Sequence, residues 1–442
     1  MSGERRRRII NQVRTQRFAV AGDYSVIPRR EDALKRDANV FVRTEQSDVG
    51  RSCFVIELDG EVFGLPEDDW RPMASIDLNR TKLCECVTVC RDKWRKVIEK
   101  QVEGPWWRST ASRPFYESYH LTAELCEEAG RELAVAGRDL FNLLFLNGSE
   151  DLEDIKKHLV EALSKRDCII TIYSEEFFVP WGMLYVHPPE DEPLGSKGQN
   201  WTKSGFIGYR HVIEHATDAH VPVSSIQLPG GLLSLGFTFD NDLEVEQSVK
   251  SIAQQKAFFE NHGAIQYYER RTKEELEAAF RQLPFPDQIS YFFLHSKTAA
   301  EGTAEAPKFY LGPEEVQAAE IQAWTGGNLA SEPFFFFNAC QAGQMMSLFF
   351  ESFALILLQL KARGLIGPQI DVPTLFAEEY ARRFFTALLD RSPSSHPIRI
   401  GLVMRQLAQD FLDKDHNPIG LAYSLFKGAH CYVSLVSSAE AQ

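Results

Sequence analysis

The sequence predicts an α/β protein whose mostly parallel sheet is flanked by helices. From residue 230 onward, apolar runs at 232–239, 264–268, 289–294 and 333–339 alternate with segments of helical periodicity. Some runs are apolar throughout, such as the four phenylalanines at 334–337, as expected of strands buried on both faces. With 44% hydrophobic and 25% charged residues, the 442-residue chain has an ordinary globular composition and can bury a sizeable core.

The first part of the chain has shorter patterns, and residues 1–115 are expected to form a small β-rich module with a basic tail. Strands at 53–58 and 61–63 flank Asp59-Gly60, a pair typical of tight hairpin turns. In the alternating run 83–90, Cys84, Cys86 and Cys90 share one parity, which favours one face of a strand.

The middle of the chain, residues 116–229, changes to helical periodicity. Residues 121–145 and 154–163 are predicted helices, 167–173 a strand, and the Pro-, Gly- and charge-rich segment 186–204 a surface loop.

Residues 230–442 form the third predicted part and show the clearest pattern. A helix over 245–257 ends before Gly263, and a second helix begins at Thr272, with Glu275 completing a capping box. The sequence therefore predicts three parts, at 1–115, 116–229 and 230–442.

Composition and charge exclude several function classes. The formal charge of −14 argues against broad binding of nucleic acid or of anionic membranes, since both need a basic face. The one basic run is at 5–8. Residues 1–30 are polar and charged rather than a signal peptide, and the apolar stretch 353–360 is too short to span a bilayer. Eight cysteines without a CxxC pair indicate neither a disulfide scaffold nor a zinc ribbon. We expect a soluble, reduced, cytoplasmic protein without a metal or other cofactor.

Two residues that can do chemistry end two of the predicted strands. His295 follows the apolar run 289–294, and Cys340 follows the run 333–339, 45 residues later. Reactive groups of open α/β sheets gather beyond the carboxyl ends of the strands. A thiolate is a nucleophile, and a nearby imidazole can lower the thiol pKa or take its proton. A tight turn at Gly343 would let backbone N–H groups face a developing oxyanion. Either residue alone is more often inert, but together they predict a Cys–His dyad.

The segments around these two residues resemble a known protease family. Residues 291–296 (YFFLHS) and 337–343 (FNACQAG) are similar to the caspase-type His and Cys motifs, and more specifically to the CHAT family of caspase-like cysteine proteases. Further similarity lies at 180–185 (PWGMLY), 206–208 (FIG) and 365–373 (LIGPQIDVP). The resemblance covers roughly 120–436.

The resemblance implies a separase-like arrangement, in which a degenerate caspase-like half at 116–229 precedes an active half at 230–442. It implies peptide-bond hydrolysis with Cys340 as nucleophile and His295 as acid/base. Ser296 stands where the family has Gly, which puts one oxyanion donor in doubt, and Gly182 replaces a Glu of the family. Proteases of this type are commonly switched on by a partner. The expectation is therefore a regulated endopeptidase with a protein substrate and an activating protein partner, acting in a bacterial defence or cell-death pathway.

Candidates for the substrate pocket are less sharply indicated. In caspase-like folds the residue two before the Cys lines the S1 pocket, and here it is Asn338. Asp240 and Asp242 follow the first strand of the active half, and Asp371 is a third acidic candidate. An acidic pocket would favour Arg or Lys at the cleaved position. The alternative for each Asp is a solvated loop carboxylate.

Two other functions remain open from the sequence. His211, Glu214 and His215 match the HxxEH pattern of zinc peptidases, in which both His lie on one face of a helix and the Glu is the base. The chain could also be a catalytically dead caspase-like scaffold that only binds partners. Ser296 in place of the family's Gly leaves this alternative open.

Overall fold

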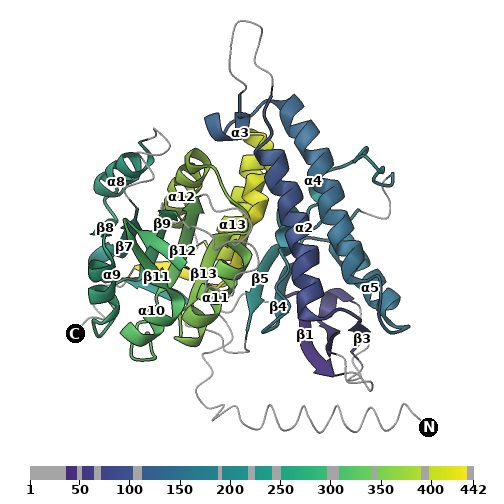
Figure 1. Ribbon diagram of the computed structural model, residues 1–442, viewed down its shortest axis with the longest axis horizontal. Coiled ribbons are helices and arrows are strands. Elements are labelled where there is room, and N and C mark those ends of the chain that lie inside the picture. Colours follow the sequence, from purple (N-terminus) through teal and green to yellow (C-terminus); the bar gives the residue numbers. More distant parts are fainter. Residues whose placement is uncertain are drawn as a thin grey trace, which may run out of the picture. The chain divides into compact units, whose positions relative to one another are not determined.

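A mixed sheet of eleven strands organises the part of the chain that the structure describes (Figure 1). The structure is a computed structural model, and it describes residues 36–46, 52–63, 71–102, 112–187, 192–217, 224–240, 250–295, 308–340, 346–389 and 398–435. Residues 35–442 form one compact unit. The sheet has the order β3-β2-β1-β4-β5-β14-β13-β12-β9-β7-β8.

The strands of this sheet come from all parts of the chain. They are β1 (Ala38–Gln46), β2 (Ser52–Asp59), β3 (Met73–Ile76), β4 (Ile169–Tyr173), β5 (Val212–Ala216), β7 (Leu233–Phe239), β8 (Ile265–Arg270), β9 (Ile289–His295), β12 (Phe334–Cys340), β13 (Gly364–Pro368) and β14 (Tyr423–Phe426). Two small sheets pair β10 (Lys308–Leu311) with β11 (Glu314–Gln317), and β6 (Ser225–Leu228) with β15 (Tyr432–Leu435).

Helices connect and cover the strands. The α-helices of the described residues are α2 (Arg80–Ile98), α3 (Pro114–Glu117), α4 (Ala123–Leu144), α5 (Leu152–Lys165), α6 (Ile207–Arg210), α8 (Ser251–Asn261), α9 (Lys273–Phe280), α10 (Ala318–Trp324), α11 (Met346–Gln359), α12 (Thr374–Leu389) and α13 (Ile400–Lys414). Short 3₁₀ turns are η3 (Glu61–Phe63), η4 (Trp181–Met183), η5 (Lys203–Gly205), η6 (Pro229–Gly231) and η7 (Pro418–Ala422).

The predicted mostly parallel sheet is confirmed. Within the main sheet, neighbouring strands are parallel except for the pairs β1–β2, β2–β3 and β13–β14. The consecutive parallel strands β13, β12, β9, β7 and β8 include the four apolar runs predicted to be strands, which correspond to β7, β8, β9 and β12. Their carboxyl ends therefore meet at one edge of the sheet.

Alternate residues of β12 pack against helices on opposite faces of the sheet. Phe336 packs against Phe384 of α12, with ring centroids 5.1 Å apart, whereas Phe337 packs against Phe353 of α11 at 6.2 Å. Helix α8 lies on the same face as α12, because Tyr291 of β9 packs against both Phe259 of α8 and Phe385 of α12. We call this side the α12 face. Figure 1 shows α8 and α12 on one side of these strands and α9, α10 and α11 on the other.

The strands of the predicted N-terminal module join the main sheet rather than forming one of their own. Strand β1 pairs in parallel with β4 and antiparallel with β2, which in turn pairs with β3. The boundaries at 115 and 229 remain predictions.

The hairpin predicted at Asp59-Gly60 is wrong, because residues 61–63 form the η3 turn and β2 pairs with β1 and β3 instead. Gly60 has φ +135°, and a Cβ there would lie 2.4 Å from the carbonyl oxygen of Asp37. The glycine therefore serves a close backbone approach rather than a two-residue turn.

The strand predicted at 83–90 is also wrong, since these residues lie within helix α2. Asn79 caps this helix by accepting a hydrogen bond from the backbone N of Lys82. Cys86 and Cys90 are buried four residues apart, which is the spacing of one helical face, and Cys84 lies half-buried beside them. Their shared parity is therefore incidental.

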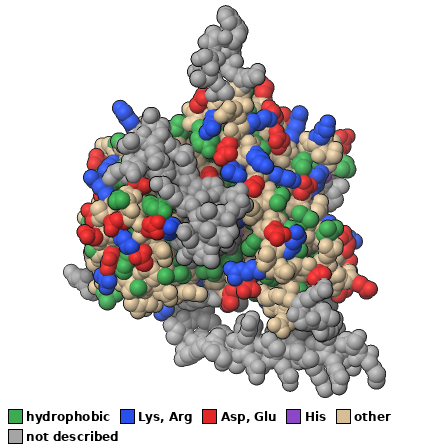
Figure 2. Space-filling view, viewed as in Figure 1, with side chains coloured by type: hydrophobic (Ala, Val, Ile, Leu, Met, Phe, Trp, Pro, Cys, Tyr) green, Lys and Arg blue, Asp and Glu red, His purple; other side chains and the backbone are tan. Residues whose placement is uncertain are grey.

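The surface shown in Figure 2 carries mixed charge. Lys and Arg side chains are interspersed with Asp and Glu over the visible described residues. Among the described helices, none is long and apolar enough to cross a membrane.

Candidate active site

The two predicted catalytic positions end neighbouring parallel strands. In the register of β9 and β12, Cys340 is the Cα partner of His295, and the pairing runs unbroken from Phe334 opposite Ile289. Adjacent strands lie about 4.8 Å apart. The backbone therefore brings these two positions, 45 residues apart in sequence, side by side at the carboxyl edge of the sheet.

Two acidic candidates flank this pair along the same edge. Asp240 directly follows β7, which neighbours β9, and its backbone N donates a hydrogen bond to the carbonyl oxygen of Phe293 at 3.2 Å. Asp371 follows β13, which neighbours β12. Along the edge the order is thus Asp371, Cys340, His295, Asp240. The two aspartates are 7% and 3% exposed, so neither is the solvated loop carboxylate of the alternative interpretation.

Asn338, the candidate pocket residue two before Cys340, is engaged in a buried network on the α12 face. Its Nδ2 donates to the Tyr291 hydroxyl at 3.2 Å and to the Ala377 carbonyl at 2.8 Å, while its Oδ1 accepts from the Tyr423 hydroxyl at 2.6 Å. Asn338 is 1% exposed. Its amide therefore links β12 to β9, α12 and β14, and both of its polar atoms are used within the protein.

Three other predicted site residues lie outside the described residues. These are the oxyanion and turn candidates Ser296 and Gly343 and the pocket candidate Asp242.

Five of the other cysteines offer poor alternatives as nucleophiles. Burial raises the pKa of Cys90 and of Cys431 to about 12, and that of Cys126 and of Cys168 to about 11. Because burial disfavours the charged thiolate, such a thiol stays protonated at neutral pH and reacts slowly. Burial, followed by nearby Glu45 and Asp77, also raises the pKa of the half-buried Cys53.

The zinc-peptidase interpretation of HxxEH is wrong, because the segment enters strand β5 rather than a helix. Successive side chains of a strand point to opposite faces, so Glu214 faces the side opposite to His211 and His215 and cannot share a site with them. Each group also has a protein partner: Glu214 pairs with Arg36, and His211 accepts a hydrogen bond at Nδ1 from the backbone N of Cys168 at 3.0 Å. The ring of His215 stacks on Phe426 at 5.0 Å. Among the described residues, no cluster of three or more His, Cys, Asp or Glu is arranged to hold a metal.

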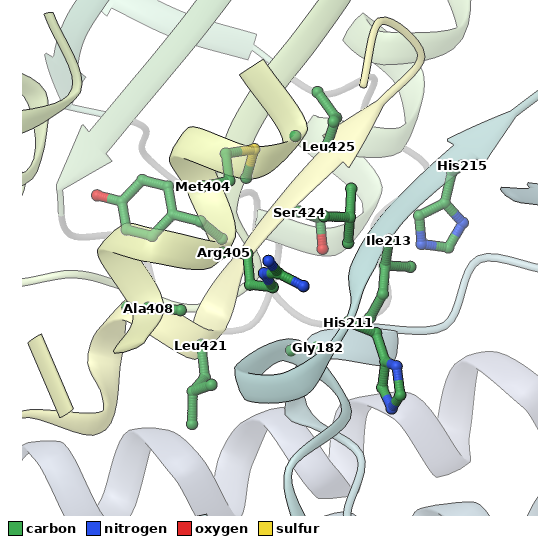
Figure 3. A pocket seen from close by; sticks show the side chains of 15 residues that line it. Gly182, His211, Ile213, His215, Met404, Arg405, Ala408, Leu421, Ser424 and Leu425 are labelled. Carbon is green, nitrogen blue, oxygen red and sulfur yellow. The ribbon is translucent and has the colours of Figure 1, made fainter. Parts of the chain in front are cut away.

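These two histidines instead line a small cavity of about 40 Å³ between β5, β14, η7 and α13 (Figure 3). Met404 and Arg405 of α13 and Ser424 and Leu425 of β14 surround it. Burial lowers the pKa of His211 to about 3 and that of His215 to about 4, so both are neutral at pH 7. The cavity contains neither the Cys–His pair nor its acidic neighbours.

Sequence patterns missed several residues at the carboxyl edge. The network partner Tyr423 lies 85 residues after Asn338, and no local signal links the two. Ser251 and Gln255 of α8 are buried polar residues four apart on a face otherwise occupied by Ile252 and Phe259. In the sequence, this polar pair within an otherwise apolar helical stripe is the pattern that could have pointed to these residues.

Comparisons with known proteins give weak structural likenesses. No family model matches the sequence, and no curated protein matches it. Two crystal structures of the Saccharomyces cerevisiae separase–securin complex are similar, with TM-scores of 0.44 and 0.42 at 8% identity. Each comparison covers 90% of this chain, which spans 30% of the matched chain. A complex of Porphyromonas gingivalis RgpB pro- and mature domains has a TM-score of 0.38 at 12% identity, covering 63% of this chain and 70% of that one. Likenesses of this strength assign neither a family nor an activity.

Proposed function

We propose that this chain is a cysteine endopeptidase of the CHAT or caspase-like type. The observation that carries the proposal is the register that makes Cys340 the Cα partner of His295 at the carboxyl edge of parallel strands. Position 340 also has the parity of Asn338, and position 295 that of Tyr291, so both belong to the α12 face. The motif resemblance around 291–296 and 337–343 supports the same pair.

The proposed reaction proceeds through an acyl-enzyme. The thiolate of Cys340 attacks the scissile carbonyl carbon, and a carbon–sulfur bond forms as the carbonyl oxygen takes the negative charge. The imidazolium of His295 then donates its proton to the leaving amine, and the carbon–nitrogen bond breaks to leave a thioester. Water, deprotonated by the imidazole, attacks the thioester and regenerates the thiolate. Backbone N–H groups around Gly343 are the proposed oxyanion donors.

The acidic residues at the edge favour a basic residue at the cleaved position. Asp240 and Asp371 are buried carboxylates on either side of the pair. A carboxylate at the edge of a pocket attracts a positively charged side chain and disfavours a negatively charged one. We assign the P1 preference to Arg or Lys, with Asp240 as the first candidate and Asp242 as a further one. The engaged amide of Asn338 supports a structural role for that residue beside the pocket.

The biological setting follows from the family resemblance alone. It includes regulation by an activating protein partner, one or a few protein substrates, and a cytoplasmic role in a bacterial defence or cell-death pathway.

Mass-spectrometric labelling of new protein N-termini tests the function in cells. Cells expressing the wild type should contain cleaved partner proteins that are absent with Cys340→Ala and with His295→Ala. Cys53→Ala, which removes a half-buried thiol elsewhere, is the matched control and should leave the cleavages intact. Identical N-termini in wild type and Cys340→Ala would contradict the proposal and favour the non-enzymatic scaffold.

A further inference from the structure

Helix α8 carries two buried polar side chains without partners. Ser251 is 0% and Gln255 3% exposed, and neither the Ser251 hydroxyl nor the Gln255 side-chain oxygen or nitrogen has a hydrogen-bond partner. Buried polar groups in native proteins are nearly always hydrogen bonded, so such exceptions call for an explanation. They are common at functional sites, where local stability gives way to function.

The packing of α8 gives the height of these residues along the sheet. The ring of Phe259 packs against Phe237 at 5.3 Å and against Tyr291 at 6.1 Å. Helix α8 connects the parallel strands β7 and β8, so it runs antiparallel to them. Four helical residues rise about 6 Å, close to two strand residues. Gln255 therefore lies level with Phe293, and Ser251 level with His295.

A second contact supports this alignment. The Lys256 ammonium lies 4.3 Å from the ring centroid of Phe239, which is two residues beyond Phe237 on β7. Helical side chains lean toward the N-terminus of their helix. For α8 that direction is toward the carboxyl edge, so the Gln255 amide extends from the level of Phe293 toward that of His295.

Another unpartnered polar group on the α12 face is farther from the pair. Tyr380 is fully buried and its hydroxyl has no hydrogen-bond partner, but its ring packs on Phe336, four residues before Cys340. Gln255 is thus the better placed of the two.

We propose that Gln255 is a positioning residue for the catalytic imidazole: its Oε1 accepts the hydrogen bond of one ring N–H of His295. This holds the tautomer whose other nitrogen faces Cys340, and Ser251 lines the same polar site. A base oriented by a third group is the general arrangement of activated nucleophiles. The inference rests on the proposed function.

The test measures how fast iodoacetamide alkylates Cys340, resolved by peptide mass spectrometry, together with the melting temperature. Gln255→Met keeps the side-chain volume but removes both hydrogen-bonding atoms, and Gln255→Glu retains an acceptor oxygen. Gln254→Met changes the exposed neighbour, whose amide is directed at Glu378 of α12, and is the matched control.

We expect Gln255→Met to slow alkylation about tenfold or more. The melting temperature should change little, because only the proposed bond to His295 is lost and no polar atom of residue 255 stays buried without a partner. Gln255→Glu should restore the rate to within about threefold of the wild type, on the scale of one charge-assisted hydrogen bond, and Gln254→Met should match the wild type.

Three outcomes overturn the inference: wild-type alkylation in Gln255→Met, a loss of rate that parallels a loss of melting temperature, or no recovery with Gln255→Glu. Failure of the proposed function gives a different result. In that case wild-type Cys340 reacts no faster than Cys53, or its rate does not depend on His295.

Discussion

Replacing Asn338 with alanine should destabilise the protein and loosen the packing of strand β12, which ends at Cys340. The substitution removes hydrogen bonds of 3.2, 2.8 and 2.6 Å to Tyr291, Ala377 and Tyr423. Each buried group that loses its partner costs about 1–3 kcal/mol. The two tyrosines have further interactions, so we take about 1 kcal/mol for each of the three groups. The free energy of unfolding should therefore fall by about 3 kcal/mol.

Urea unfolding at pH 7, followed by tryptophan fluorescence, measures this loss as a lower midpoint at unchanged slope. Asn261→Ala is the matched control. Asn261 is exposed and bonds only within its own helix, to the Ala257 carbonyl at 2.7 Å, so its replacement should stay within about 0.5 kcal/mol.

A double-mutant cycle isolates the bond between β12 and β14. Tyr423→Phe removes the same hydrogen bond from the other side, so the two losses should be non-additive, with a coupling of about 1 kcal/mol. The reasoning is refuted if Asn338→Ala unfolds at the wild-type urea concentration while altering which residue is cleaved. The Asn338 amide would then face the substrate.

Four further predictions follow from the packing and charges. Gly236→Ala places a Cβ 1.9 Å from Asp287 Oδ2 and 2.0 Å from Arg270 Nη1, so the free energy of unfolding should fall by about 3 kcal/mol or more. Gly263→Ala, whose Cβ has nothing within 4 Å, is the control and should unfold like the wild type. Equal urea midpoints for the two variants would contradict this prediction. Burial lowers the pKa of His215 to about 4, below its unfolded value of 6.5. The neutral buried ring therefore contributes its full stability above pH 6.5, and this contribution is lost as the pH falls toward 4. Between pH 7 and 5 the free energy of unfolding of His215→Phe should fall by about 2 kcal/mol less than that of the wild type, and equal falls would contradict this. Asp240→Asn should weaken the preference for Arg or Lys at the cleaved position, as read from fragment N-termini, and an unchanged preference would exclude Asp240 from the pocket. Proteolysis should survive chelators and disappear on thiol alkylation; the reverse would require a metal enzyme.

Local patterns predicted the strands between residues 230 and 340 well, because their signals lie within the strands and turns themselves. The capping box at Thr272 and Glu275 is confirmed, with both reciprocal hydrogen bonds present. The apolar run that ends at Cys340 forms a strand buried on both faces. Fold class follows from such alternation, since few layer arrangements bury these segments.

The errors arose where short patterns fit two structures. The run 83–90 has an alternating set of cysteines and also a helical set of buried residues, and the cap at Asn79 decides for the helix. The HxxEH segment has helical spacing but enters a strand that pairs with β4 and β14. Tertiary pairing overrides local spacing in such cases.

Sheet order and register could not be predicted from the sequence, because they depend on contacts between distant segments. The sequence placed His295 and Cys340 at strand ends but could not show that β9 and β12 are neighbours. The flanking positions of Asp240 and Asp371 depend on the same strand order, and the unpartnered state of Gln255 depends on three-dimensional packing.

The most direct measurement of the central claim is the alkylation rate of Cys340 between pH 5 and 9, in the wild type and in His295→Ala. If the two residues share a proton, wild-type Cys340 should react well below pH 7, as a thiolate paired with an imidazolium does, and His295→Ala should shift the profile toward the ordinary thiol pKa of about 8.5. Superimposable profiles with an ordinary thiol midpoint would contradict the dyad and the protease assignment with it.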